Sequence, residues 1–490
     1  MNVNELLSFF QTNIENNKFP RFKAMEHFDD FYKTIFGPNL WRSMRVSLLC
    51  NNKYSAVVNN YSDSEIVAER LEQRGALNMR KLFEMQFEKK STETAALDAG
   101  KLEEKVKKMH ENIDIVISKK QEKDLLSGSF NQYLKAPPEE EPRTLIENSV
   151  PEKPVVEHQT LSLAESMKNA DIDEHRIINS KNSLSSSTLY EFMPTTRVKG
   201  FDSWISESEH YEFYKKNLDF PITVEEEKFL PFPKHLQVYT YEKCNVSSFR
   251  RPMPGSSGVF DYYLLDGASV LPILALNLKK GDRLLDMCGA PGGKAITAFQ
   301  TLLPDEVVCN DISISRVERI RKVAKEYLFD TSAENKFHIT HENALKIDKP
   351  NYYNKILVDV PCTNDRLSVN NDENSWFATN RIKERLMLPE LQADILTAAL
   401  KLVEPGGTVV YCTCSLSPVQ NDGVVQMALK KVWMENNFKI VVKNMVEAFR
   451  PANIVFHMGM NVGMKYGILV LPHLTANFGP LYFAKLKKLP

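Results

Sequence analysis

The stretch Leu284-Leu-Asp-Met-Cys-Gly-Ala-Pro-Gly-Gly-Lys294 decides how the second half of this chain folds. Its apolar start is typical of a buried strand, and a glycine-rich turn then leads into a helix. Gly292 and Gly293 let the backbone approach a ligand closely, because glycine has no Cβ. A phosphate-binding P-loop is excluded, since that motif needs glycine in place of Cys288 and serine or threonine in place of Ala295. The turn also lacks the Gly-x-Gly-x-x-Gly dinucleotide fingerprint, so it either serves another ligand or merely links strand and helix.

Residues 236–490 alternate between strand and helix patterns. We predict four strands, at Arg283–Met287, Glu306–Asn310, Lys355–Val360 and Thr408–Thr413. We predict helices at Val259–Leu276, Ser315–Phe329, Lys383–Leu402 and Asn421–Glu435, and a further helix that begins at about Lys294. This alternation predicts an α/β fold with a mostly parallel sheet and helices on both faces. Ligands of such sheets bind outside the carboxyl ends of the strands, where the candidate site residues fall.

Two cysteines stand at the ends of predicted strands, Cys362 in Val-Asp-Val-Pro-Cys-Thr and Cys414 in Tyr-Cys-Thr-Cys-Ser. Thiolates at these places suit covalent attack on an electrophilic base, although one such cysteine alone is more often a small buried hydrophobic residue. Cys412 and Cys414 lie on the same face of a strand, so proximity does not choose between them. We expect no metal site, because no second Cys or His pair with ligand spacing accompanies this Cys-x-Cys pair.

The polar residues around the glycine turn suit a particular ligand. Lys294 stands beside the glycines and can receive a carboxylate. Asp311 follows the second strand, where its carboxylate can accept hydrogen bonds from both hydroxyls of a ribose. S-adenosylmethionine presents an amino-acid carboxylate and a ribose diol, so the residue types favour it as cofactor.

Composition sets broad limits. The chain has 490 residues, 43% of them hydrophobic, and a formal net charge of −1. Its length allows about three domains at the usual ~150 residues each. Seven cysteines without paired spacing predict reduced thiols in a reducing compartment. No apolar run approaches the ~20 residues that span a bilayer, so we expect a soluble protein.

The chain divides into three parts by composition and hydrophobic pattern. Residues 1–90 form a mainly helical segment, in which aromatic residues at helical spacing precede Gly37-Pro38 and 66–87 reads as an amphipathic helix. Residues 91–235 are acidic and rich in Pro, Glu and Ser, which predicts a largely disordered insertion. Residues 236–490, the predicted sheet domain, belong to the net basic remainder, which is compatible with a nucleic-acid substrate.

The chain resembles the Sun-domain (Fmu-like) RNA cytosine-5 methyltransferases. The resemblance rests on Asp286-Met-Cys-Gly-Ala-Pro-Gly-Gly-Lys294, Asn310-Asp-Ile-Ser313, Asp359-Val-Pro-Cys362, Thr413-Cys-Ser-Leu416, Tyr262-Tyr-Leu-Leu-Asp-Gly-Ala-Ser269 and Glu384–Leu396. Within the family the chain is most similar to the mitochondrial ribosomal-RNA member, over roughly residues 20–90 and 236–490. The resemblance implies a Rossmann-like class I S-adenosylmethionine-dependent methyltransferase fold.

The resemblance also implies roles for single residues. It makes Cys414 the nucleophile that adds to carbon 6 of cytosine, and Cys362 the thiol that assists release. It places Asp359 where a carboxylate can contact the base or the cofactor. The glycine turn, Lys294, Asp311 and Asp359 would bind the cofactor, together with Arg316 on the following helix. Asn343 stands where relatives usually have an aspartate beside the adenine amino group, a departure that leaves a neutral acceptor.

Substrate, partner and location follow from the resemblance alone. It implies mitochondrial small-subunit ribosomal RNA as substrate, ribosome assembly as context, and the mitochondrial matrix as location. It also implies a partner of the transcription-termination-factor (mTERF) family that supplies RNA contacts. The first residues are a poor presequence, because Glu5 and Glu15 precede the first basic residue, Lys18.

Two alternatives stay open on the sequence. A non-catalytic ribosome-assembly factor could retain the fold and the cofactor, although both cysteines and Asp359 are intact. A cytosine-5 methyltransferase acting on another RNA or on DNA is the other alternative; the DNA enzymes use the Pro-Cys thiol as nucleophile, and this chain lacks their other motifs.

Overall fold

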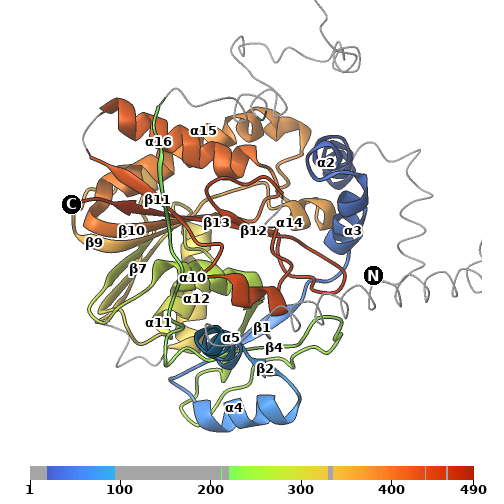
Figure 1. The fold of residues 1–490 in the computed structure, drawn as a ribbon, viewed down its shortest axis with the longest axis vertical. Helices are drawn as coiled ribbons and strands as arrows, with labels where there is room; N and C mark the ends of the chain where they lie inside the picture. Colours follow the sequence, from blue (N-terminus) through green and yellow to red (C-terminus); the bar gives the residue numbers. More distant parts are fainter. Residues whose placement is uncertain (1–18, 94–210, 212–219, 329–334, 436–437, 460–461) are drawn as a thin grey trace, which may run out of the picture. The chain divides into compact units, whose positions relative to one another are not determined.

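The computed structural model describes residues 19–93, 211, 220–328, 335–435, 438–459 and 462–490 (Figure 1). Of the range 91–235, in which we expected a largely disordered insertion, 94–210 and 212–219 lie outside the described residues. The described residues up to Thr92 and from 220 onward belong to one compact unit, which is built on two sheets. No helix among them is long and apolar enough to cross a bilayer.

The larger sheet is the mostly parallel sheet predicted above. Its parallel strands run in the order β8 (Phe337–Thr340), β7 (Glu306–Asn310), β6 (Arg283–Asp286), β9 (Tyr353–Asp359) and β10 (Val403–Thr413). Beyond β10 follow the antiparallel β13 (Leu481–Lys488), with β12 (Ile468–Val470) and β11 (Ile440–Asn444) on it, and then β3 (Thr223–Glu226). The four predicted strands are confirmed as β6, β7, β9 and β10, whereas the antiparallel edge was not predicted.

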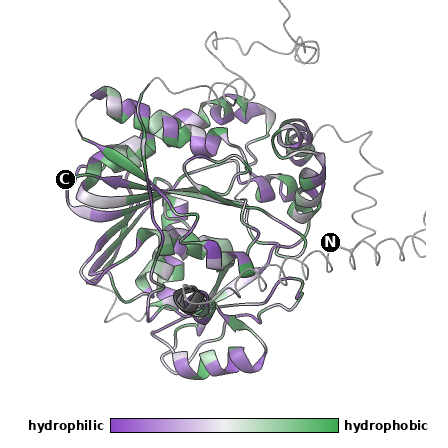
Figure 2. Ribbon diagram, viewed as in Figure 1, coloured by the Kyte–Doolittle hydropathy of each residue, from purple (hydrophilic) through white to green (hydrophobic). Residues whose placement is uncertain are grey.

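Helices cover both faces of this sheet (Figure 1). On one face lie α10 (Leu271–Leu276), α11 (Gly293–Phe299) and α12 (Ile314–Tyr327), and on the other α15 (Ile382–Leu402) and α16 (Val424–Glu435). Alternate residues of β9 serve the two cores: Leu357 packs on the α11 side, and Ile356 and Val358 on the α15 side. A strand buried on both faces reads as a continuous apolar run, which explains why its sequence was easy to assign. Figure 2 shows hydrophobic residues in these central strands and a largely hydrophilic outer helix α4.

A smaller antiparallel sheet joins the beginning of the chain to the sheet domain. Its strands run in the order β2 (Leu77–Asn78), β4 (Val238–Thr240), β1 (Tyr54–Val58) and β5 (Tyr262–Asp266). We expected residues 1–90 to be a segment of their own; the structure pairs its strand β1 along the whole length of β5. Its helices are α2 (Pro20–Phe36), α3 (Pro38–Leu49), α4 (Ser64–Gln73) and α5 (Met79–Glu93).

The predicted helix Val259–Leu276 is wrong in its first half. Residues Tyr262–Asp266 form β5, a 3-10 turn covers Gly267–Val270, and only α10 is α-helical. The side chain of Asp266 accepts a hydrogen bond from the backbone N–H of Ala268 and so starts the turn there. The strand exists because β1 pairs with it, and such a distant partner leaves no trace in local periodicity.

The predicted helix over 66–87 is also wrong, because Gly75 divides it into α4 and α5. Gly75 has a φ of 79°, in the left-handed region that favours glycine. Its N–H donates to the carbonyl of Glu72, and the N–H of Ala76 donates to the carbonyl of Leu71. This paired pattern is a Schellman motif, which ends α4 before β2 begins.

The remaining elements shape the rim of the sheet. Short helical turns cover Ala344–Lys346 (η5), Thr379–Arg381 (η6), Val419–Gly423 (η7) and Arg450–Ile454 (η8). Helix α14 (Asp365–Asn370) follows directly on the loop after β9 and packs against α2 and α3 (Figure 1). The amino-terminal helices therefore reach the part of the fold that carries the predicted site.

Candidate active site

The order of the parallel strands creates the site. β6 and β9 are neighbours, although β7 and β8 lie between them in the sequence and continue the sheet on the far side of β6. At such a reversal the connections leave in opposite directions and open a crevice at the carboxyl ends of the strands. Asp286 ends β6 and Asp359 ends β9, while Asp311 directly follows β7 and Cys414 follows β10.

The glycine turn after β6 is tightly packed. Gly292 has a φ of 104° and precedes α11, and its N–H donates to the carbonyl of Gly289 at 2.6 Å. A Cβ on Gly293 would lie 3.0 Å from the ring of Tyr263, and one on Gly289 would lie 2.4 Å from Sγ of Cys309. Glycine at 289 therefore suits the buried thiol on the neighbouring strand.

Lys294 at the start of α11 and Asp359 at the end of β9 form a partly buried ion pair. Nζ of Lys294 donates to Oδ2 of Asp359 at 2.7 Å, and the lysine is 9% exposed. Burial is the largest single effect and would lower the pKa of Lys294. The charge of Asp359 and its hydrogen bond, together with the nearby Cys412 and Cys414, outweigh burial and raise that pKa well above its ordinary value. The ammonium that we expected to receive a ligand carboxylate is thus held in place by a strand-end aspartate.

Asp311 and Arg316 connect the end of β7 to the glycine turn. Asp311 is buried, and its Oδ1 accepts from the backbone N–H of Ser313 at 3.0 Å. Its Oδ2 has no hydrogen bond in the described structure and lies 3.4 Å from Nη2 of Arg316. The same Nη2 donates to the carbonyl of Ala290 at 3.1 Å. The arrangement leaves one carboxylate oxygen of Asp311 able to accept from a ligand.

Asn343 lies apart from this cluster in its hydrogen bonding. It precedes η5, and its side-chain oxygen accepts from the backbone N–H of Leu345 at 3.0 Å. The sequence-predicted acceptor is therefore engaged in its own turn, although its loop follows β8 next to the end of β7.

Asp286, at the end of β6, belongs to the site but was not among the predicted site residues. It is fully buried, and neither carboxylate oxygen has a well-formed hydrogen bond in the described structure, although the nearby backbone N–H of Cys288 favours its charged form. Burial, and after it the charge of Asp359, raise the pKa of Asp286 to about 8. A buried acceptor without a donor is rare in a folded protein, so Asp286 is a candidate to accept hydrogen bonds from a ligand.

The raised pKa predicts how Asp286 affects stability. The folded state keeps a proton that the unfolded state loses near its ordinary pKa, so its contribution is present below about pH 4 and is lost as pH rises to about 8. Relative to Asp286→Asn, the ligand-free wild type should lose about 1.4 kcal/mol of unfolding free energy per pH unit between about pH 5 and 7. Urea unfolding over this range measures it, with the exposed Asp305→Asn as control. Parallel curves for wild type and Asp286→Asn would contradict the assignment.

The three candidate thiols are distinguished by burial. Cys412 is fully buried, pairs with Asp359 in the strand register, and its Sγ donates to Oδ1 of that residue at 3.4 Å. Cys414 is the first residue beyond β10 and is partly exposed, although it packs against the same core cluster as Cys412. The backbone N–H of Cys414 donates to Sγ of Cys362 at 3.2 Å, which brings the two strand-end thiols together.

The pKa shifts of Cys362 and Cys412 show which of these thiols stay protonated. The interaction with the side chain of Cys414, and then burial, raise the pKa of Cys362 well above its ordinary value. Burial and the charge of Asp359 likewise raise the pKa of Cys412. Cys362 and Cys412 therefore keep their protons at neutral pH, and a thiol is a far weaker nucleophile than a thiolate.

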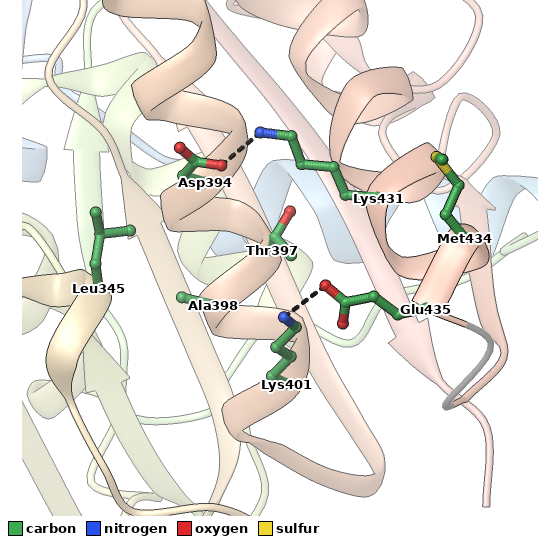
Figure 3. Close-up of a pocket in the computed structure, with 8 residues that line it drawn as sticks. All are labelled: Leu345, Asp394, Thr397, Ala398, Lys401, Lys431, Met434 and Glu435. Carbon is green, nitrogen blue, oxygen red and sulfur yellow. Dashed lines mark hydrogen bonds and ion pairs between the residues drawn. The ribbon is translucent and has the colours of Figure 1, made fainter.

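A surface pocket elsewhere in the unit is unrelated to this cluster. It lies between α15 and α16 beside η5, with a volume of ≈ 450 Å³ (Figure 3). Two ion pairs, Lys431 with Asp394 and Lys401 with Glu435, bridge the helices across it. None of the sequence-predicted site residues lines it. In the described parts of the chain no group of three or more His, Cys, Asp or Glu side chains could hold a metal ion.

Comparisons with known proteins agree with this geometry. Residues 273–487 match the family described as 16S rRNA methyltransferase RsmB/F. A Caenorhabditis elegans protein named 5-cytosine rRNA methyltransferase nsun-4 is 33% identical over 98% of this chain and 95% of its own length. The Mus musculus 5-cytosine rRNA methyltransferase NSUN4 is 42% identical over 52% of this chain and 68% of its own. A Danio rerio mitochondrial tRNA (cytosine(34)-C(5))-methyltransferase is 35% identical over 46% of this chain and 61% of its own.

The strand order, with acidic residues at the ends of its central strands, is that of a class I S-adenosylmethionine-dependent methyltransferase. The chain belongs to the RsmB/F, or Sun-domain, family of RNA cytosine-5 methyltransferases. It is an enzyme, and S-adenosylmethionine is its methyl donor, as the resemblance implied.

The residues present fit this cofactor. S-adenosylmethionine carries hydrogen-bond donors in its ammonium group and ribose hydroxyls, and one carboxylate. The two oxygens of Asp286 and Oδ2 of Asp311 are buried acceptors without donors, and Lys294 is a buried cation beside them. A ligand with these groups would satisfy oxygens that are otherwise left unpaired.

Proposed function

We propose that this enzyme methylates carbon 5 of a cytosine in the small-subunit ribosomal RNA of mitochondria and so supports ribosome assembly there. Two relatives named as 5-cytosine rRNA methyltransferases support the substrate class, and the family description names a small-subunit RNA. A relative named as a mitochondrial enzyme supports the compartment, with the matrix as the site of action.

In this proposal Cys414 is the nucleophile. Carbon 5 of cytosine is a poor nucleophile until Sγ of a thiolate adds to carbon 6, which moves the electrons of the C5–C6 double bond toward carbon 5. Partial exposure at the end of β10 supports this role for Cys414, because the base must leave its stack to reach the sulfur. Bound S-adenosylmethionine supplies the electrophilic methyl group.

Cys362 and Asp359 support the reaction from β9. After methylation a water molecule takes the proton from carbon 5, the electron pair of that C–H bond restores the C5–C6 double bond, and the bond from carbon 6 to Sγ of Cys414 breaks, with its electrons going to the sulfur. Cys362 holds a proton beside Cys414 and can stabilise the departing thiolate. Asp359, fixed by Lys294, can accept a hydrogen bond from the polar edge of the base.

The glycine turn and the strand-end carboxylates hold the cofactor in this proposal. Gly292 and Gly293 keep the backbone close to it, Lys294 faces its carboxylate, and Asp311 accepts from the ribose hydroxyls. Arg316 forms an ion pair with Asp311 and so holds its carboxylate in place. Asp286 takes the ammonium group, and Asn343 contributes at the adenine once its turn rearranges.

The ribose contact predicts a loss of affinity. Asp311→Ala should weaken S-adenosylmethionine binding about 10- to 150-fold, because a hydrogen bond to a charged group contributes about 1.5–3 kcal/mol. Asp311→Asn, which keeps the shape, should lose less. Calorimetry on folded protein measures the change, with Asp394→Ala, from the ion pair between α15 and α16, as control. Unchanged affinity in Asp311→Ala would remove this residue from the site.

We also propose a division of labour along the chain. Residues 236–490 carry the catalytic domain, residues 1–90 form an accessory segment, and the acidic range 91–235 links them. An mTERF-family partner supplies further RNA contacts, since residues 236–490 contain no separate RNA-binding signature.

The observation that carries the proposal is the hydrogen bond from the Cys414 N–H to Sγ of Cys362, which unites two thiols beside Asp359. Bisulfite sequencing of ribosomal and transfer RNA from cells with and without the protein tests reaction, substrate and compartment together. We expect one cytosine of mitochondrial small-subunit RNA to lose its methyl group. Loss only in a transfer RNA or a cytosolic RNA would replace the substrate, and no loss at all would favour a non-catalytic assembly factor.

A further inference from the structure

The loops that carry the two cysteines are tied together by one buried carboxylate. Asp365 stands three residues after Cys362, and its backbone N–H donates to the carbonyl of Cys414 at 3.2 Å. Its Oδ2 accepts from the backbone N–H of Leu416 at 2.7 Å, and its Oδ1 accepts from the hydroxyl of Ser415 at 3.1 Å. Asp365 therefore fixes the chain directly after Cys414 against the loop that contains Cys362.

The amino-terminal helix α2 also contacts the junction between these two loops, which is formed around Asp365. The hydroxyl of Tyr32 donates to Oδ2 of Asp365 at 2.7 Å, across 333 residues of sequence. Tyr32 is 1% exposed, stacks on Phe28 at 4.9 Å between ring centroids, and meets Trp41 edge-on at 5.4 Å. Its ring is thus held on both sides, and its hydroxyl reaches the cysteine loops from a fixed position.

A second contact holds the amino-terminal helices to the same loop. Arg366, next to Asp365, donates through Nη1 to the carbonyls of Ser47 and Cys50 at 2.9 Å each. These carbonyls lie at the end of α3, so the guanidinium caps that helix. The loop after Cys362 is consequently anchored to α2 and α3 as well as to the loop after Cys414.

Because Asp365 is charged, the contact between the two loops is sensitive to the loss of any one of its hydrogen bonds. In the described part of the chain its carboxylate accepts from the hydroxyls of Thr363, Ser415 and Tyr32 and from one amide, none of which is a cation. Burial raises the pKa of Asp365, and these hydrogen bonds oppose that rise. A buried anion held only by neutral donors depends on each of them, so the loss of one loosens the others.

We propose that Asp365 and Tyr32 are positioning residues that set the place of Cys414 relative to Cys362, so that the docking of α2 is part of the catalytic apparatus. This inference rests on the proposed roles of the two cysteines. Neither residue touches the reacting atoms; each acts through the loops that present them. Small errors in the placement of a reacting group can cost a large factor in rate.

The test is the rate at which the full chain is captured by a 5-fluorocytosine-containing RNA in the presence of S-adenosylmethionine. Tyr32→Phe removes one hydroxyl and keeps the ring, and should slow capture about 3- to 30-fold. The matched control is Tyr239→Phe, because the buried Tyr239 donates from its hydroxyl to the carboxylate of Glu72, at 3.0 Å, in the small sheet. Both variants should keep the wild-type dissociation constant for S-adenosylmethionine, measured by calorimetry.

A double-mutant cycle on the capture rate distinguishes a positioning role from a purely structural one. Asp365→Asn should slow capture more than Tyr32→Phe, and the combined variant should be no slower than Asp365→Asn alone, because both changes break one junction. Equal capture rates for Tyr32→Phe, Tyr239→Phe and wild type would overturn the inference, as would additive effects in the cycle. If wild type itself forms no adduct, or if Cys414→Ala is captured like wild type, the proposed function fails instead.

Discussion

Replacement of Cys414 by alanine is expected to abolish both methyl transfer and covalent capture of RNA. Without a sulfur at this position nothing adds to carbon 6, and carbon 5 does not become nucleophilic. Loss of a covalent nucleophile typically costs a factor of 10⁴ or more, roughly 10⁶ in well-studied hydrolases. Tritiated methyl transfer and a denaturing gel shift with 5-fluorocytosine RNA measure the two losses separately.

Cys412→Ala is the matched comparison for Cys414→Ala. Its sulfur is fully buried and donates to Asp359, so its removal should leave substantial turnover and normal capture. The reverse pattern, with capture lost in Cys412→Ala and kept in Cys414→Ala, would move the nucleophile into the strand β10.

Cys362→Ala is expected to have the second largest effect, of a different kind. Attack by Cys414 remains possible, whereas the proton that stabilises the departing thiolate is gone. A covalent protein–RNA adduct with ordinary cytosine should therefore accumulate, and turnover should fall by roughly 10²- to 10⁴-fold, the usual range for a lost proton-transfer group.

The adduct of Cys362→Ala can be checked on a denaturing gel with unmodified RNA. It should disappear in the double variant Cys362→Ala/Cys414→Ala, which removes the attacking sulfur as well. Normal turnover of Cys362→Ala without any adduct would reject the two-thiol mechanism, while the assignment of Cys414 would stand.

The catalytic end of the sheet was predictable because its signals are local. Each central strand is a short apolar run buried on both faces, and the chemistry-bearing residues follow directly on those runs. The glycine turn could be assigned from residue identity, since the phosphate-binding motifs failed at Cys288 and Ala295. The choice of Cys414 over Cys412 came from the match to the family motif, and the structure adds that β10 ends at Thr413 between them.

The parts that sequence could not supply depend on distant partners. β5 is a strand because β1 pairs with it from the other side of the acidic insertion. Gly75, by contrast, is a local signal, since a glycine within a helical pattern is a common place for a helix to end. The role of Asp286 shows only as burial without a donor, and the contact of Tyr32 with Asp365 spans 333 residues. Neither has a signature in the periodicity of the chain.

The central claim is that Cys414 forms the bond to carbon 6 of cytosine. The most direct measurement is to digest the wild-type adduct with 5-fluorocytosine RNA by protease and nuclease and to locate the attached nucleotide by tandem mass spectrometry. We expect the mass increment on Cys414 alone, in the peptide that also contains Cys412. An increment on Cys412 or Cys362, or an adduct that persists in Cys414→Ala, would contradict it.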